Sequence, residues 1–243
     1  MTIHPLTFAT IAQALARGWV VANATRGVSI AYSLVFVLGG AAIMGALLAL
    51  GYAPFVIAAA GAFMLVGPAI LAGFFGIARA WEEAGRVDMA AIIRGFSSAA
   101  GAVWALAMVC GLLFMIFLTD AATLYAYMVG GAPVWLTDLI PVAGGIARFV
   151  VWAAASGAVV ALLLFCISAF AVPLLCERRA GLVDAVTTSV RAVLGNFVPA
   201  VAWGLLLSAL VIASIFLLPL LPLTLPWLAY ASRALYREVL PPG

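Results

Sequence analysis

Long, uninterrupted apolar runs decide what this chain can fold into. Six follow one another, and a helix of about 20 apolar residues crosses the roughly 30 Å hydrocarbon core of a bilayer. The runs lie at about Val28–Leu50, Phe55–Ala78, Ala102–Leu118, Ala147–Leu175, Phe197–Leu218 and Pro219–Arg237. Because 68% of the 243 residues are apolar and only 8% are charged, a water-soluble fold could not bury this surface. Lipid must therefore be the solvent.

The secondary structure follows from the continuity of these runs. They are rich in Ala, Leu and Gly, whereas a membrane β-barrel needs short segments of alternating polarity. We therefore predict an all-α polytopic membrane protein with six transmembrane helices arranged as three hairpins. An amphipathic helix at the cytoplasmic interface is expected before each hairpin.

A short motif occurs twice and divides the chain. Ala84–Asp88 and Ala180–Asp184 both read Ala-Gly-x-Val-Asp, and each is followed by an amphipathic run that contains an arginine near its end. The aspartates are expected to act as N-caps of these two helices. The match is short, so a chance origin stays open.

The N-terminal segment fits as a weaker third copy. Residues 1–27 contain an apolar pattern of nearly helical period, with Thr7 or Thr10 as a cap. The predicted units are residues 1–78, 79–175 and 176–243, within one membrane domain.

Arginine indicates the orientation. All eleven basic residues are arginines, and all except Arg148 fall on one side of the six-span arrangement. The positive-inside rule then places both termini and both joints in the cytoplasm. The residues expected to hold the interfacial segments and joints are Trp19, Arg17, Trp81, Asp88, Arg94, Arg178, Arg179, Asp184 and Arg191.

Two features could carry transport. Asp120 lies near the outer end of the third run, where a carboxylate could serve as a proton or ion site or could pair with Arg148. The prolines of the Pro219–Pro226 stretch could break a helix to form a substrate site, or could mark a plain turn. The sequence favours the ion pair and the turn.

Other functional classes find no residues to support them. His4 is the only histidine, and it lies outside the apolar runs, so we expect no haem, metal or other cofactor. We recognise no motif of a known catalytic site and no arginine block of the nucleic-acid kind, so we expect neither an enzyme nor a nucleic-acid partner. A lipid-active enzyme would need a nucleophile or base that we cannot name.

The second joint and the C-terminus carry a family resemblance. Ala171–Arg178, Asp184–Val193, Leu225–Leu228 and Tyr236–Glu238, with Asn196 and Trp203, resemble bacterial integral membrane proteins grouped as domain of unknown function 2189. The resemblance implies a six-span inner-membrane protein. Some relatives are loosely labelled as cytochrome c oxidase-like. Relatives often have histidines near the final Tyr-Arg, and Tyr230 and Ala234 occupy those positions here, so no histidine role carries over.

Two functions remain as hypotheses. The first is a non-catalytic accessory or scaffold protein that associates with a larger inner-membrane complex, for which a respiratory or photosynthetic assembly is a candidate. Its smooth, Gly- and Ala-rich spans motivate this view. The alternative is a small transporter or channel that uses Asp120 and the Pro219–Pro226 helix break.

Overall fold

The structure, a computed structural model, describes residues 2–53, 55, 67–99, 101–130 and 144–241. Its regular elements in these residues are helices, as predicted. They are α1 (Phe8–Ala24), α2 (Arg26–Ala49), α4 (Gly67–Ala84), α5 (Ala90–Ser98), α6 (Gly101–Val129), α7 (Gly144–Ser168), α8 (Ala171–Cys176), α9 (Leu182–Gly195), α10 (Phe197–Phe216), the 3-10 turn η2 (Leu218–Leu220) and α11 (Leu221–Val239).

Four segments of the described chain are long and apolar enough to cross a membrane. They are Arg26–Ala49, Gly101–Val129, Ala147–Cys176 and Phe197–Ser214. The third joins α7 to the short α8, and the fourth is most of α10. The fold is thus all-helical with several helices suited to lipid.

The six predicted spans are not all found. The second, Phe55–Ala78, lies partly outside the described residues, and α4 covers its later part. The sixth becomes α11, which is not among the candidate spans because its last turns carry Arg233, Arg237 and Glu238. This helix packs extensively against α1 instead.

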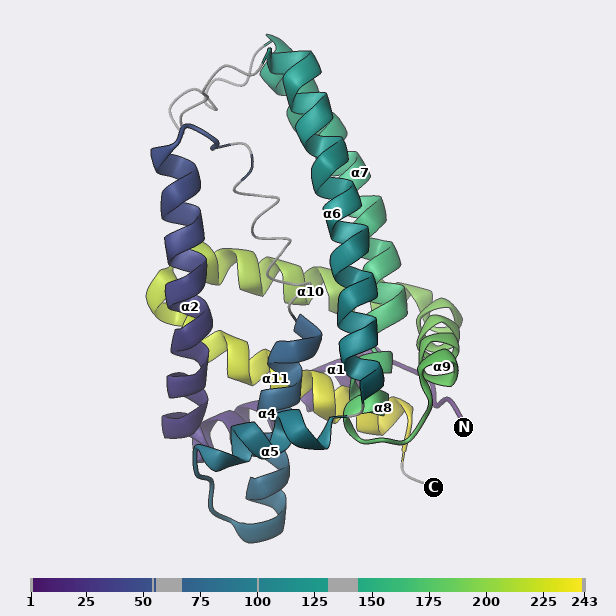
Figure 1. Ribbon diagram of the computed structural model, residues 1–243. Helices are drawn as coiled ribbons and strands as arrows, with labels where there is room; N and C mark the ends of the chain where they lie inside the picture. The colour runs from purple at the N-terminus through teal and green to yellow at the C-terminus, as the bar shows by residue number, and fades with distance from the viewer. Residues whose placement is uncertain (1, 54, 56–66, 100, 131–143, 242–243) are drawn as a thin grey trace.

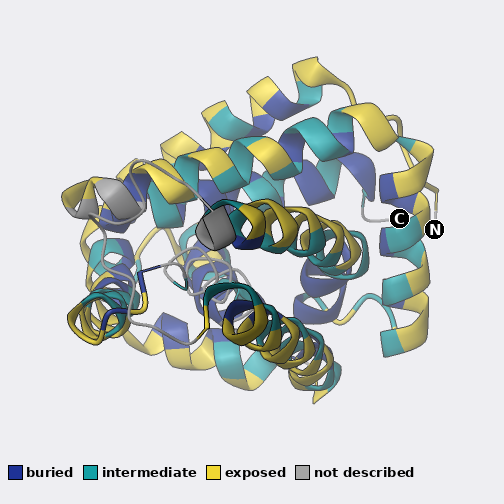
Figure 2. Ribbon diagram, turned by 90° about the horizontal axis from the view of Figure 1, so that it is seen from above, coloured by how far each residue is buried: buried dark blue, intermediate teal, exposed yellow. Residues whose placement is uncertain are grey.

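The helices adopt two orientations. In Figure 1, α2, α6 and α7 stand upright, whereas α10 and α11 run across them and α5 lies at the lower end. The upright helices expose much of their apolar surface, as the yellow bands in Figure 2 show. Only 17% of the apolar window in each of α2 and α6 is buried. Such a surface is stable when lipid or another protein covers it.

The predicted units are interlocked. Each helix that precedes a hairpin packs on the last helix of another unit: α5 on α4, α9 on α7 and α8, and α1 on α11. The last pair joins the two ends of the chain, and the His4 backbone N–H also donates to the Val239 carbonyl at 2.8 Å. The three units therefore share one packed lower end and are not separate bodies.

Small residues permit the closest of these contacts. A Cβ on Gly18 of α1 would lie 2.5 Å from the backbone nitrogen of Ala231 in α11. A Cβ on Gly76 of α4 would lie 2.5 Å from the Cα of Gly95 in α5. Both Gly18 and Gly95 directly follow an arginine in the predicted repeat, so equivalent positions serve as the close-packing points of two helix pairs.

A break separates α7 from α8. Pro173 has no N–H to donate to the carbonyl of Ala169, and its ring would clash with that carbonyl. The helix is interrupted at Ala169 and Phe170, as this geometry requires. The buried Ser189 hydroxyl of α9 fills the gap, because it accepts from the Phe170 N–H at 3.1 Å and donates to the Cys166 carbonyl at 2.8 Å.

Removal of the Ser189 hydroxyl should destabilise this junction. The change Ser189→Ala leaves the Phe170 N–H and the Cys166 carbonyl without their bridging partner, and we expect a loss of about 1–3 kcal/mol in unfolding free energy. Thermal unfolding in detergent would measure it. The matched control is Ser156→Ala on α7, whose hydroxyl bonds only within its own helix. Equal effects of the two changes would contradict the bridging role.

The predicted helix caps are confirmed in part. Thr7 caps α1 through a capping box with Thr10. The Asp88 carboxylate accepts from the Ala91 N–H at 3.0 Å and so caps the start of α5. The prediction for Asp184 is wrong, because α9 already begins at Leu182 and Asp184 lies within its first turn. Its charge there still complements the helix dipole.

Candidate functional site: a charged cleft where three helices end

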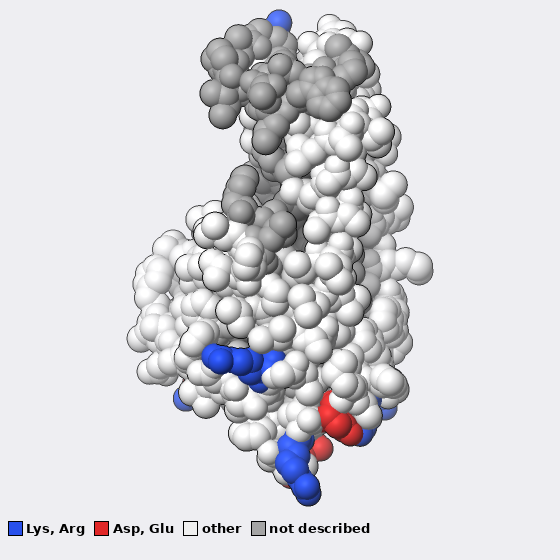
Figure 3. All heavy atoms as spheres, turned by 90° about the vertical axis from the view of Figure 1, so that its left-hand side faces the viewer, with Lys and Arg blue, Asp and Glu red and all other residues white. Residues whose placement is uncertain are grey.

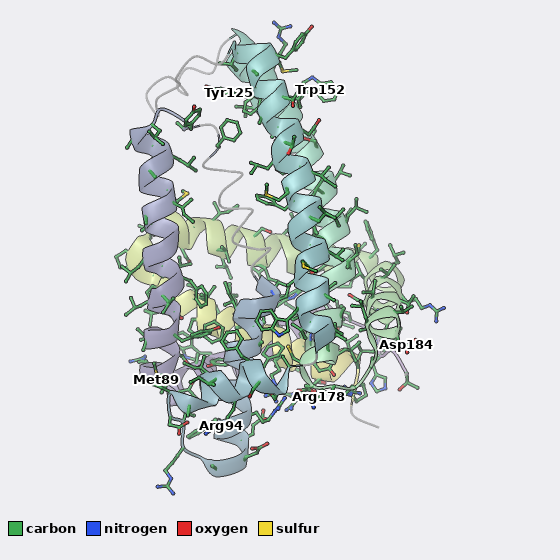
Figure 4. All side chains as sticks on the ribbon, viewed as in Figure 1. Met89, Arg94, Tyr125, Trp152, Arg178 and Asp184 are labelled. Atoms are coloured by element: carbon green, nitrogen blue, oxygen red, sulfur yellow. The ribbon has the colours of Figure 1, made fainter. Side chains whose placement is uncertain are left out.

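Charged side chains gather at the lower end of the molecule. Figure 3 shows basic and acidic atoms there on one face and almost uncharged surface above, apart from a basic group at the top. Figure 4 places Arg94 and Arg178 at this lower end and Tyr125 and Trp152 at the opposite one. The last turns of α4 and α11 and the segment after α8 meet here and bring their charges together.

Four of these residues form an ion-pair network, which we call the Arg–Glu cluster: Glu82, Glu177, Arg233 and Arg237. Arg233 contacts Glu82 at 2.6 Å and Glu177 at 3.3 Å. Arg237 contacts the same two carboxylates at 3.1 and 3.0 Å. The two glutamates are thus clamped between two guanidinium groups that come from one helix.

Burial makes this network costly to disrupt. The Arg233 side chain is only 5% exposed and that of Glu177 13%. Burial alone would raise the pKa of Glu82, but hydrogen bonds and positive charge from Arg233 and Arg237 outweigh it and lower the pKa. Glu82 therefore stays ionised through the physiological range. A buried charge without its partner would cost several kcal/mol.

Three further arginines donate hydrogen bonds to backbone carbonyls at helix ends. Arg79 donates to the Cys176 carbonyl at 3.3 Å, at the end of α8. Arg178 donates through Nε to the Ser98 carbonyl at 2.8 Å, at the end of α5. Arg179 donates to the Leu240 carbonyl at 2.6 Å, just beyond α11. Cations at helix C-termini are favoured by the helix dipole.

The turn after α8 holds Arg178 in an unusual backbone conformation. Arg178 has φ 53°, in the left-handed region. The N–H of Arg179 bonds to the Leu174 carbonyl and that of Arg178 to the Leu175 carbonyl, which is a Schellman motif. Glycine is the usual residue at this position, as Gly85 is after α4. Arginine here costs about 1–2 kcal/mol of backbone strain.

These side chains line an open cleft of about 490 Å³, which we call the charged cleft. Its residues are Arg79, Glu82, Glu83, Ser98, Cys176, Glu177, Arg178, Arg179, Arg233 and Arg237. Five arginines face three glutamates, an excess of two positive charges. Among the described residues, no three side chains of His, Cys, Asp or Glu lie together in a way that could hold a metal ion.

The joint residues predicted from the sequence surround this end, and two of them line the cleft. Arg178 and Arg179 are those two. Arg94 forms an exposed ion pair with Asp88 at 2.7 Å and so holds the start of its own helix α5. The remaining joint residues lie outside the cleft lining.

The N-terminal joint residues contact α11. Arg17 pairs with Glu238. Trp19 is 48% exposed and packs edge-to-face on Trp227, with ring centroids 5.7 Å apart. These contacts fix α1 against α11 and explain why this segment does not lie free of the helix bundle.

The other candidates lie away from the cluster. Trp81 is half-buried on α4, and Asp184 and Arg191 are exposed on α9. Asp120 and Arg148 are both exposed, on α6 and α7, and the structure records no ion pair between them in the described residues. A role for Asp120 in transport stays a prediction.

Sequence reasoning missed the Arg–Glu cluster. Arg233 and Arg237 were interpreted only as topology markers, and the two glutamates were not singled out. Arg233 and Glu82 are separated by 151 residues and Arg237 and Glu177 by 60. The sequence does contain one indication of the cluster. Three apolar runs are followed by both arginine and glutamate, and all three of these ends are predicted to lie on the same side of the membrane.

Comparison with known proteins gives a family and no closer relative. Residues 55–177 match the family described as predicted integral membrane protein (DUF2189). This segment contains the first joint and ends at Glu177, so it includes only the first part of the motif at the second joint. Searches of curated proteins and of solved structures find no match. Because half of the chain matches, the protein belongs to the DUF2189 family of predicted integral membrane proteins.

Proposed function

We propose that this integral membrane protein is a non-enzymatic accessory or scaffold subunit that packs against a larger complex of the bacterial inner membrane. The observation that supports it best is the exposed face of α2. A Cβ on Gly39, Gly40 or Gly45 would meet nothing within 4 Å. Small residues on a membrane helix let the backbone of a partner helix approach closely.

The orientation in the membrane is part of the proposal. The charged cleft and the arginine-bearing joints face the cytoplasm, in keeping with the positive-inside rule. The uncharged lengths of α2, α6 and α7 lie in the hydrocarbon core. A third hairpin formed by α10 and α11 would complete six spans if both helices, which run across α6 and α7 in Figure 1, stood upright in the bilayer, with both termini cytoplasmic.

Native purification tests the scaffold role. The protein, extracted with mild detergent, should co-migrate with a complex of respiratory or photosynthetic type. The change Gly39→Leu should release it from that complex without lowering its own melting temperature. The matched control is Val35→Leu on α2, which replaces an already bulky exposed residue. Migration as a lone chain, with every membrane complex unchanged in its absence, would refute the proposal.

A transporter is the second candidate, because α6 continues without interruption to Val129 and therefore holds Asp120 on a helix suited to lipid. A carboxylate in such a helix is often a coupling site. The Pro219–Pro226 stretch gives it less support, since η2 and the first turn of α11 account for Pro219 and Pro222. Under this hypothesis, Asp120→Asn abolishes ion-coupled flux in liposomes, and unchanged flux excludes Asp120.

A further inference from the structure

We propose that the charged cleft binds a phosphate-bearing anion, either the headgroup of an anionic lipid or a soluble phosphate compound. This inference does not depend on whether the protein has a partner complex. It follows from the charge balance, the free donors, the strained turn and the position of the cleft.

The charge balance leaves room for an anion. Two of the three cleft glutamates, Glu82 and Glu177, form ion pairs with Arg233 and Arg237 in the Arg–Glu cluster. Arg79, Arg178 and Arg179 make no ion pair with a carboxylate in the described chain, and their hydrogen bonds there go only to neutral oxygens. Clustered guanidinium groups repel one another unless an anion neutralises them.

Hydrogen-bond donors remain available in the cleft. A guanidinium carries five N–H donors in a planar fork that matches the oxygens of phosphate. Within the part of the chain that the structure describes, Arg178 donates only through its Nε–H, so its two terminal nitrogens keep their donors. Among the described residues, the Arg233 Nε has no hydrogen-bond partner, but it is buried 3.3 Å from a Glu177 oxygen and is therefore not exposed to a ligand in the cleft. Ion-pair distance without hydrogen-bond geometry leaves this donor unsatisfied.

The turn after α8 places the Arg178 guanidinium at the cleft, although the left-handed backbone conformation of Arg178 costs free energy. Strained backbone persists where the surrounding structure enforces it, and such positions cluster at functional sites. Glycine would relieve the strain, as Gly85 does at the end of α4, but would supply no cation. The presence of arginine in place of glycine therefore indicates that the positive charge has a function at this position.

The size and position of the cleft suit this class of ligand. A volume of about 490 Å³ falls within the range typical of small-molecule sites. The cleft is open and lies at the end of the molecule where the charges gather (Figures 3 and 4). A helix bundle in lipid has its headgroup layer at such a level, where arginines reach phosphates.

Two arms of one experiment separate the possible sources. In the lipid arm, native mass spectrometry compares phosphatidylglycerol with phosphatidylcholine on the full-length protein. In the soluble arm, equilibrium dialysis measures inorganic phosphate and pyrophosphate on protein in phosphatidylcholine nanodiscs. We expect binding of phosphatidylglycerol, or of the soluble anions, to fall about tenfold or more in the double variant Arg79→Gln/Arg178→Gln.

The control is Arg191→Gln, which removes one positive charge from exposed α9, outside the cleft lining. Its affinity should match that of the wild type. If the double variant fails to fold, Arg178→Gly serves in its place, because it relieves backbone strain while it removes the guanidinium. Binding of no probe by the wild type overturns the proposal, as does an equal loss of affinity in Arg191→Gln.

Discussion

Replacement of Arg233 by methionine is expected to lower the free energy of unfolding by about 3–5 kcal/mol. The Arg233 side chain is 5% exposed and holds Glu82 and Glu177 at 2.6 and 3.3 Å. Methionine keeps much of the length of the side chain but supplies no charge. Glu177, itself 13% exposed, would then share Arg237 with Glu82 as its cation within the Arg–Glu cluster.

Two companion variants show whether burial causes this loss. Arg237→Met, at a side chain 39% exposed, should cost about 1 kcal/mol or less because solvent screens its ion pairs. Addition of Glu82→Gln and Glu177→Gln to Arg233→Met should recover part of the stability, since neutral amides need no counter-ion. Chemical unfolding in detergent measures all of them. Equal losses for Arg233→Met and Arg237→Met would show that the cluster does not form as described.

The change Gly76→Ala is expected to destabilise the protein by about 3 kcal/mol, at the upper end for overpacking. The added methyl group would lie against the Ala91 carbonyl and 2.5 Å from the Cα of Gly95. Backbone atoms cannot move aside as a flexible side chain can, so α4 and α5 would have to separate. The charged end of α4, which carries Glu82, would shift with them.

Gly45→Ala on α2 is the matched control. A methyl group there would meet nothing within 4 Å, and alanine is the better helix former by about 1 kcal/mol. We expect unchanged or slightly higher stability, measured by thermal unfolding in the same detergent. A small effect of Gly76→Ala would mean that α4 and α5 are farther apart than the structure places them.

Local features could be predicted because they depend on neighbouring residues. Thr7 satisfies backbone donors of the turn that follows it, and Asp88, two residues before the first residue of α5, accepts from the Ala91 N–H. The break before Pro173 falls inside the predicted span Ala147–Leu175, although the conflict of the proline ring with the preceding turn is itself a local effect. Asp184 was misplaced because its helix starts two residues earlier, at Leu182, where the sequence offers no capping side chain.

Long-range pairings could not be predicted in this way. Ser189 could not be assigned to the gap between α7 and α8 without the knowledge that α9 packs there. Nor does any local pattern pair α11 with α1 at the opposite end of the chain. The expected third hairpin is not confirmed among the described residues, and the charged end of α11 pairs with α1, α4 and the segment after α8.

The sequence by itself determined the solvent, the helical class, the family and most local helix ends, because apolar content and backbone capping act over a few residues. The tertiary structure alone decided that charges on three distant helix ends meet in one cleft. Charges interact more strongly where solvent is excluded, so the largely buried Arg233 and Glu177 stabilise each other once packing brings them together. Which helices pack together depends on shape, and glycines such as Gly18 and Gly76 reveal their function only beside a partner helix.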